Sequence, residues 1–258
     1  MPILQGLIIA ISTFSGIPTP KVSWEARGMA WALMFLPVVG LCIGAVLVAW
    51  YALCSALEVL PLLRAVGYTV LPLLVTGAIH MDGFCDTADA LASNAGVQKR
   101  QEILHDPHSG AFAIIAVALY LLVFFGFTVQ LPDAWSFVLA FAAVFIVSRG
   151  LGGLATLWFE AAETSQLASA LRNPRVKAPS TAILILWVVA GAALLVICTP
   201  WPGMVALIIA VLVFVLARFW LVRQFGGFSG DLAGWLIQMV ELTALVGLVL
   251  TSLILEVL

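Results

Sequence analysis

A succession of long apolar segments is the feature of this sequence that most restricts its fold. Seven such segments fall at about 30–57, 60–79, 110–130, 135–158, 181–200, 203–220 and 233–256. Each is long enough for a membrane-spanning helix, which needs about 20 predominantly apolar residues. In lipid, only helices and closed barrels satisfy all their backbone hydrogen bonds. The pattern predicts an all-α, polytopic integral membrane bundle of about seven transmembrane helices.

The composition agrees with this fold class. Hydrophobic residues make up 64% of the chain and charged residues 9%, against about 45–50% and roughly 25% in soluble domains. The spans leave only loops over, so we expect one membrane-embedded domain over residues 1–258. Residues 3–17 form an additional short apolar helix, and the sequence leaves open whether it crosses the membrane. The net charge of −2 excludes a basic field for nucleic acid.

The basic residues predict an orientation. Successive spans place four polar segments on one side, and these segments carry Lys21, Arg27, Lys99, Arg100, Arg172, Arg175, Lys177, Arg218 and Arg223. The loops on the opposite side are short and hold no Lys or Arg. Because cytoplasmic loops are enriched in Lys and Arg, we expect the charged face to be cytoplasmic.

A stripe of aspartates follows the second apolar segment. If this region is helical, the spacing of Asp82, Asp86 and Asp89 places all three carboxylates along one helix face. Such like charges are tolerated where a divalent cation offsets them, and oxygen ligands suit Mg²⁺. A solvated acidic helix face is the alternative interpretation. The apolar neighbours of the stripe favour the metal site.

A second polar cluster precedes the third span. Asp106 and His108 flank a proline there. These side chains could contact a substrate, or the segment could be a helix-entry turn in which Asp106 or Ser109 caps the next helix.

The third polar cluster, Gly226 to Asp231, is a glycine-rich turn that leads into the last span. Backbone N–H groups of such a turn can bind an anion, and Arg218 and Arg223 nearby suit a phosphate. The turn contributes Gly227, Ser229 and Asp231 as candidate substrate-binding residues.

Two charges fall inside spans. Arg149 lies in the fourth span and Glu241 in the last. Charged groups within a bilayer usually face a polar cavity or one another. Either the two residues form a structural ion pair, or they line the same cavity as the aspartates and bind substrate. Together, acidic ligands, arginines and a glycine-rich turn at one membrane face indicate transfer of a phosphate-linked group.

These segments resemble the cobalamin 5′-phosphate synthase family (adenosylcobinamide-GDP ribazoletransferase). The similarity is carried by FSGIPTP (14–20), GAIHMDGFCDTADALAS (77–93), RQEILHDPHSGAF (100–112), Ser148-Arg149 and GGFSGDLAGWLIQMVEL (226–242). These motifs occur in the family's order over nearly the whole chain. Three positions depart from the family pattern, namely Ala90, His108 and Ser229. Every carboxylate is in place, so only substrate contacts near His108 are put in doubt.

The resemblance implies a Mg²⁺-dependent transferase in the bacterial inner membrane, with its active site facing the cytoplasm. Adenosylcobinamide-GDP and α-ribazole, or its 5′-phosphate, would give adenosylcobalamin, or its 5′-phosphate, and GMP. On this basis Asp82, Asp86 and Asp89 hold the metal, with Asp89 the first candidate for the base. Substrate contacts fall to Asp106, His108, Arg149, Arg223, Gly227, Ser229, Asp231 and Glu241. The oligomeric state is open, and a homo-oligomer is one possibility.

Two other classes are weighed against this one. CDP-alcohol phosphatidyltransferases share the chemical logic, but their D-G-x2-A-R-x8-G-x3-D-x3-D pattern fails here because Phe84-Cys85-Asp86-Thr87 follows Asp82-Gly83. A secondary transporter would show repeated halves and charges at the membrane midplane. The sequence shows no internal repeat, and its carboxylates lie at one face.

Overall fold

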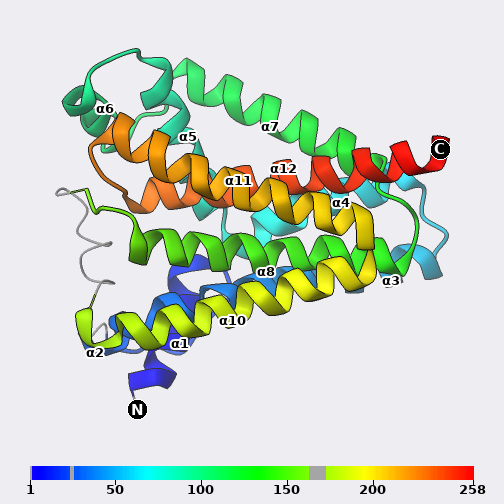
Figure 1. Ribbon diagram of the computed structural model, residues 1–258, viewed down its shortest axis with the longest axis horizontal. Helices are drawn as coiled ribbons and strands as arrows, with labels where there is room; N and C mark the ends of the chain where they lie inside the picture. Colours follow the sequence, from blue (N-terminus) through cyan, green and yellow to red (C-terminus); the bar gives the residue numbers. More distant parts are fainter. Residues whose placement is uncertain (1, 24–25, 163–172) are drawn as a thin grey trace.

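The computed structural model describes residues 2–23, 26–162 and 173–258 (Figure 1). Arg172 lies outside the described residues, as does the side chain of Arg27. The described helices are α1 (Pro2–Phe14), α2 (Ala26–Ala32), η1 (Leu33–Phe35), α3 (Leu36–Ala56), α4 (Pro61–Thr76), α5 (Ile79–Ala92), α6 (Val97–Leu104), α7 (Ala111–Val129), α8 (Trp135–Trp158), α10 (Pro174–Cys198), α11 (Pro200–Phe225) and α12 (Gly230–Val257). An isolated bridge joins Ala161 to Phe228.

The expected all-α membrane bundle is confirmed. Six helical stretches are long and apolar enough to cross a membrane, and α4 with α5 makes a seventh if that bent pair counts as one span. The six are Gly28–Ala56, which combines α2 from its third residue with η1 and α3, and helices α7, α8, α10, α11 and α12. α1 is apolar but has only 13 residues, so its length of about 20 Å falls short of the ~30 Å hydrocarbon core.

The second span differs from its predicted form. The hydropathy pattern predicts an uninterrupted segment over 60–79, but α4 ends at Thr76 and α5 leaves at 95° to it. Gly77 and Ala78 both have φ of 59°, in the left-handed region. The Ala78 N–H donates to the Leu73 carbonyl at 2.9 Å, which closes the end of α4. The acidic stripe therefore lies on a separate helix rather than on an extension of the span.

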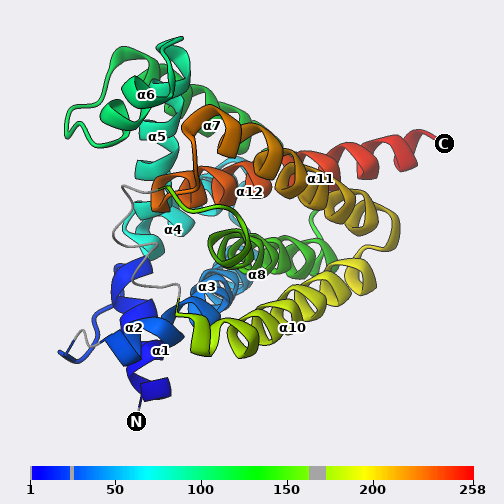
Figure 2. The same ribbon diagram turned by 60° about the vertical axis from the view of Figure 1, so that its left-hand side comes forward.

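Helix α8 forms the centre of the bundle, and α3, α10 and α12 pack around it (Figure 2). Small residues allow these close approaches, as is common between membrane helices. A Cβ added to Gly40 of α3 would lie 2.2 Å from the Phe145 carbonyl oxygen of α8. One added to Gly191 of α10 would lie 2.9 Å from Val147. Helices α10 and α11 are mostly exposed along their length, which suits contact with lipid.

One end of the bundle gathers the polar segments. Helices α5 and α6, the start of α10, the end of α11 and the start of α12 all lie at this end (Figure 1). Most of the described basic residues of the predicted cytoplasmic face lie on three of these segments. They are Lys99 and Arg100 in α6, Arg175 and Lys177 in the first turn of α10, and Arg218 and Arg223 in the last turns of α11. At the other end, Arg64 forms an ion pair with Asp133 at 2.7 Å.

Candidate active site

The three aspartates of α5 lie on one helix, as their spacing predicts. Asp82 is exposed, whereas Asp86 and Asp89 are half-buried. The charges of Asp82, Asp89 and Asp231 all act on Asp86, so these three carboxylates lie within electrostatic range of Asp86. Unpaired, these like charges repel. A cation or another positively charged group would stabilise the cluster.

Close contact between α5 and α12 brings Asp231 to the stripe. A Cβ added to Gly83 would lie 2.7 Å from the Asp231 carbonyl oxygen, and one added to Gly234 would lie 2.9 Å from the His80 carbonyl oxygen. The two glycines thus let the helix backbones approach where the carboxylates sit. The geometry of the acidic cluster depends on this crossing.

We expect Gly83→Ala to lower activity at least tenfold and to cost about 1–3 kcal/mol of stability, because overpacking would push α12 away from α5. Turnover and thermal unfolding of detergent-purified protein would measure the two effects. Gly126→Ala in α7 is the matched control, since an added Cβ there meets no atom within 4 Å. Equal activity of the two variants would contradict a role for this crossing.

The glycine-rich turn is built to start α12. Gly226 ends α11 with a φ of 66°, which glycine adopts without a steric penalty. The Ser229 hydroxyl then accepts a hydrogen bond from the Leu232 N–H at 3.3 Å and caps α12.

The same turn also contacts the segment that follows α8. Gly227 packs against the backbone of Ala162, and the Phe228 N–H donates to the Glu160 carbonyl at 2.7 Å. The turn thereby positions Asp231, while substrate binding by Gly227 and Ser229 stays a prediction.

Helix α6 is fixed to the end of α11. Arg100 donates to the Gln224 carbonyl at 3.3 Å and to its side-chain oxygen, and Gln101 Nε2 donates to the Phe225 carbonyl at 2.7 Å. Both residues thus satisfy carbonyls that the last turn of a helix leaves without partners. The sequence pattern assigned Arg100 only to the orientation of the chain and missed this contact. The sequence feature that could have indicated this contact is a basic residue, a type that often binds the C-terminus of a helix.

Asp89 has a structural partner. Its carboxylate accepts hydrogen bonds from the Gly110 N–H at 3.1 Å and the Ala113 N–H at 3.3 Å, at the start of α7. Capping of this helix by Asp106 or Ser109, the alternative left open above, is therefore wrong. A carboxylate offers about four lone-pair positions, so two remain. The assignment of Asp89 as ligand or base stays a prediction.

The loop between α6 and α7 holds the second polar cluster. Asp106 Oδ1 accepts from the backbone N–H of His108 at 2.9 Å and lies 2.9 Å from its ring Nδ1. Both side chains are exposed. The backbone N–H of His108, and then its ring, hold the pKa of Asp106 below its ordinary value. His105 in the same loop lies within electrostatic range of Asp231, so the loop borders the acidic cluster.

Arg223 lies in a different hollow. Together with Glu160, Arg218 and Gly226 it lines a space of about 410 Å³ at the end of α11. Arg218 is partly committed there, because it donates to the Trp158 carbonyl at 3.3 Å. Arg223 thus offers a positive charge beside the glycine-rich turn, but not within the cavity that holds Asp82.

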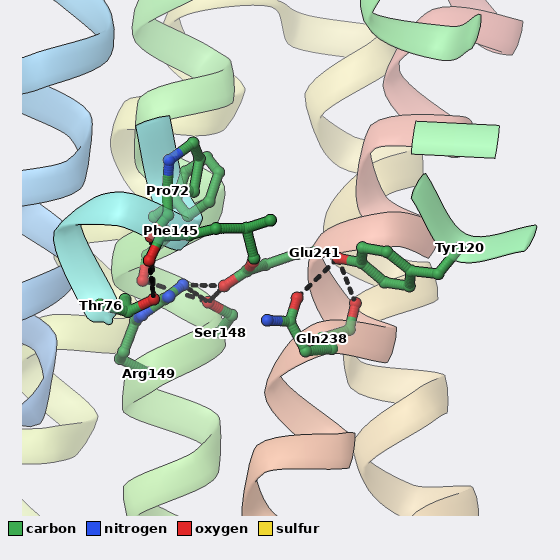
Figure 3. Close-up of polar contacts among 9 residues, drawn as sticks. Pro72, Thr76, Tyr120, Phe145, Ser148, Arg149, Gln238 and Glu241 are labelled. Atoms are coloured by element: carbon green, nitrogen blue, oxygen red, sulfur yellow. Dashed lines mark hydrogen bonds and ion pairs between the residues drawn. The ribbon is translucent and has the colours of Figure 1, made fainter. Parts of the chain in front are cut away.

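Arg149 and Glu241 form a buried ion pair between α8 and α12 (Figure 3). Their side chains are 1% and 2% exposed. Ser148 Oγ donates to Glu241 at 3.1 Å, and Arg149 donates to Ser148 Oγ at 2.9 Å. The structure thus forms the ion pair that the sequence left as one alternative. Each charge already has its partner in the structure. Substrate binding by Arg149 or Glu241 stays a prediction.

A cavity borders the crossing of α5 and α12, and residues of α1, η1, α3 and α8 complete its lining. It has a volume of about 230 Å³ and is lined by Phe14, Leu33, Leu36, Ile79, His80, Asp82, Thr156, Gly230, Asp231, Ala233, Gly234 and Ile237. Asp82 also lines a more open hollow of about 520 Å³, so it lies where the two spaces meet.

His80 is the cavity residue to which the sequence pattern gave no role. Its side chain is buried, and its Nδ1 has no hydrogen-bond partner in the structure. A buried polar atom normally has a partner, so His80 Nδ1 is one of several buried polar atoms whose hydrogen-bonding capacity is unused among the described residues. The available signal was a histidine two residues before Asp82, at the start of the acidic stripe.

The donor set suits magnesium. Asp82, Asp86 and Asp231 offer carboxylate oxygens, the ligands that Mg²⁺ prefers. Over the ranges that the structure describes, no three Asp, Glu, His or Cys side chains converge on one metal position. Mg²⁺ is commonly held by one or two carboxylates plus water and substrate phosphates. A Mg²⁺ site with two of these aspartates as protein ligands is therefore compatible with the structure.

Comparison with known proteins identifies the family. Residues 6–249 match the family model described as cobalamin-5-phosphate synthase. An adenosylcobinamide-GDP ribazoletransferase of Lachnoclostridium phytofermentans is 36% identical over 93% of this chain and 92% of its own length. Relatives with the same name from Pseudomonas fluorescens (33% identical; 91% of this chain, 92% of theirs) and Clostridium perfringens strain 13 (32%; 93% and 96%) are also similar. No solved structure matches the chain. The chain belongs to the cobalamin-5-phosphate synthase family.

Proposed function

We propose that this chain joins adenosylcobinamide-GDP to α-ribazole or its 5′-phosphate and releases GMP, in the late nucleotide-loop assembly step of cobalamin biosynthesis. The observation that carries the proposal is the acidic cluster of Asp82, Asp86 and Asp231, which borders a cavity at one end of a membrane bundle. The family match supports the same reaction.

In this reaction the ribose 3′-hydroxyl oxygen bonds to the phosphorus that stays on the corrinoid. The bond from that phosphorus to the bridging oxygen breaks, and GMP leaves with the oxygen. The hydroxyl proton passes to a carboxylate, for which Asp89 and Asp82 are the candidates. Because a carboxylate is a weak base near neutral pH, orientation of the two substrates must supply much of the rate.

We propose that Asp82 and Asp86 hold Mg²⁺ together with water and substrate phosphates, while Asp89 and Asp231 add negative charge beside them. When bound, the ion would offset the charge of the diphosphate. Arg223 and His108 are the proposed contacts for the guanylyl phosphate or the ribazole phosphate. Both are exposed, His108 in the loop that borders the acidic cluster and Arg223 beside the glycine-rich turn. We also propose that the charged end of the bundle faces the cytoplasm, where soluble nucleotides could reach it.

The test uses nanodisc-held protein with adenosylcobinamide-GDP, α-ribazole 5′-phosphate and MgCl₂. We expect stoichiometric GMP and corrinoid product, loss of both with EDTA, and recovery with added Mg²⁺. CDP-diacylglycerol with an alcohol acceptor serves as the control substrate pair. Formation of CMP from that pair without GMP from the first would overturn the proposal. Full turnover in EDTA would contradict the proposed role of Mg²⁺.

A further inference from the structure

Asp89 differs from the other aspartates of α5 in what its carboxylate contacts. Its Oδ2 accepts a hydrogen bond from the Gly110 N–H at 3.1 Å, and its Oδ1 accepts one from the Ala113 N–H at 3.3 Å. Both oxygens thus satisfy N–H groups that the start of a helix leaves without partners. The described residues that line the 230 Å³ cavity and the more open hollow include Asp82 but not Asp89.

Gly110 provides the space for this contact. A Cβ added to Gly110 would overlap both carboxylate oxygens of Asp89. The backbone of Gly110, with φ of −81° and ψ of 173°, is one that any residue adopts, so the backbone does not require glycine here. The space that the Asp89 carboxylate occupies is therefore the reason for a residue without a side chain.

The position of Asp89 along α5 also sets it apart from Asp82. Seven residues separate the two, which is about 10 Å along a helix axis at 1.5 Å per residue. An ion that binds two carboxylate oxygens at about 2.0–2.1 Å holds those oxygens about 4 Å apart or less. A carboxylate held against the start of α7, two helical turns from Asp82, is badly placed to share an ion with it.

The contact fixes one end of the loop between α6 and α7. The other end follows α6, which Arg100 and Gln101 hold to the last turn of α11. Between these anchors the loop carries His105, which lies within electrostatic range of Asp231, and the proposed phosphate contact His108. Loss of the α7 anchor would let the loop move relative to the acidic cluster.

We propose that Asp89 is a positioning residue, which caps α7 from α5 and thereby holds the α6–α7 loop beside the acidic cluster, and that it is neither a Mg²⁺ ligand nor the base. The inference rests on the proposed function, and within that function it leaves Asp82 as the carboxylate that takes the hydroxyl proton. Asp89 acts through the loop that carries His108 and touches no reacting atom.

Two substitutions of Asp89 separate these roles. Asparagine caps helices about as well as aspartate, but it lacks the charge that a ligand or base needs, so we expect Asp89→Asn to keep kcat/KM for GMP formation within about threefold. Asp89→Ala should lower kcat/KM at least about tenfold, because small misplacements of reacting groups are costly. The Mg²⁺ concentration for half-maximal rate should stay within about twofold in both variants, since neither removes a ligand. An Asp89→Asn variant as inactive as Asp89→Ala, or one that needs more Mg²⁺, would overturn the proposal.

Gly110→Ala tests the same contact from the side of α7. The added Cβ should displace the Asp89 carboxylate, so this variant should lose about as much activity as Asp89→Ala. The double variant Asp89→Ala/Gly110→Ala should stay within about twofold of either single variant, because one contact is lost only once. Losses that multiply in the double variant would contradict the shared contact.

Hydrogen exchange reports on the loop itself. Peptides covering residues 105–113 should exchange faster in Asp89→Ala and Gly110→Ala than in wild-type protein held in nanodiscs, since the N–H groups at the start of α7 lose their acceptor. Asp89→Asn should exchange nearly as slowly as wild type. Unchanged exchange in an Asp89→Ala variant that has lost activity would show that Asp89 does not act through the loop.

Asn173→Ala is the matched control for the loss of a helix cap. The Asn173 side chain accepts a hydrogen bond from the Arg175 N–H at 3.0 Å and caps α10. This variant should speed exchange at the start of α10 and leave kcat/KM within about twofold of wild type, because a lost cap acts on the first turn of its own helix. An equal loss of activity in Asn173→Ala would reduce the effect of Asp89 to general destabilisation and overturn the proposal.

The outcomes separate this inference from the proposed function. If wild-type protein forms GMP and Asp89→Asn is as inactive as Asp89→Ala, the function stands and the inference is wrong. If wild-type protein forms no GMP, the proposed function fails and the positioning role falls with it, whatever the exchange of the loop.

Discussion

Asp82→Asn should lower kcat/KM for GMP formation at least about 1,000-fold, which corresponds to roughly 4 kcal/mol of transition-state stabilisation. Asp82 is the exposed carboxylate shared by the 230 Å³ cavity and the more open hollow, so it can reach substrate groups bound in either space. Asparagine keeps the shape but removes the charge that would hold the metal. Initial rates at saturating Mg²⁺, with both substrates varied, measure the effect.

Glu256→Gln is the control, because Glu256 is an exposed carboxylate near the far end of α12. It should leave kcat/KM within twofold of wild type. The two variants should elute identically in detergent size-exclusion chromatography, since the Asp82 side chain makes no hydrogen bond to another described residue, and its backbone bond to the Ala78 carbonyl is kept in the variant. A fully folded Asp82→Asn variant with wild-type turnover would exclude the proposed metal site.

Glu241→Leu is expected to destabilise the protein by about 3–5 kcal/mol, because it leaves the buried guanidinium of Arg149 without its counter-ion. The double variant Arg149→Leu/Glu241→Leu should be more stable than this single variant, since no charge is then left unpaired. The free energy of unfolding in mixed detergent micelles measures both differences.

The ion pair between Arg64 and Asp133 gives a matched comparison. The Asp133 side chain is 61% exposed, so Asp133→Asn should cost about 1 kcal/mol or less. If Glu241→Leu costs no more than Asp133→Asn, or if the double variant is less stable than Glu241→Leu alone, the buried pair does not act as a coupled unit.

The helices were predictable because their signal is local. Apolar length marks a span, and the spacing of Asp82, Asp86 and Asp89 marks one helix face whatever surrounds it. The end of α4 was not predictable in this way, because hydropathy does not register backbone conformation. Gly77 is a natural helix end, but Ala78 gives no sign of a φ of 59°. The right-angled turn is a product of tertiary packing that holds α5 against α12.

The candidate site was predictable in its residue types but less so in their partners. Arg149 could have been paired with Glu241 or exposed to a cavity. The outcome depends on which faces of α8 and α12 are in contact, and the hydrophobic periodicity of the sequence does not determine those faces. The contact of Asp89 with the start of α7 joins segments about 20 residues apart, and only the path of the loop decides it. No role for His80 followed from the sequence, because the burial of its Nδ1 without a hydrogen-bond partner is a property of the folded chain alone.

The pairing of Arg149 with Glu241 also has a consequence for how the chain is made. α8 enters the membrane with an arginine whose partner is roughly 90 residues away, an interval of about 5–20 s at ordinary rates of synthesis. A lone charge near the middle of an inserted helix costs about 2.5–3.5 kcal/mol. Until α12 arrives, α8 must therefore stay beside the insertion machinery or near the lipid headgroups. Helix α12 completes the centre of the bundle, so a chain truncated before α12 should be recognised by quality-control proteases.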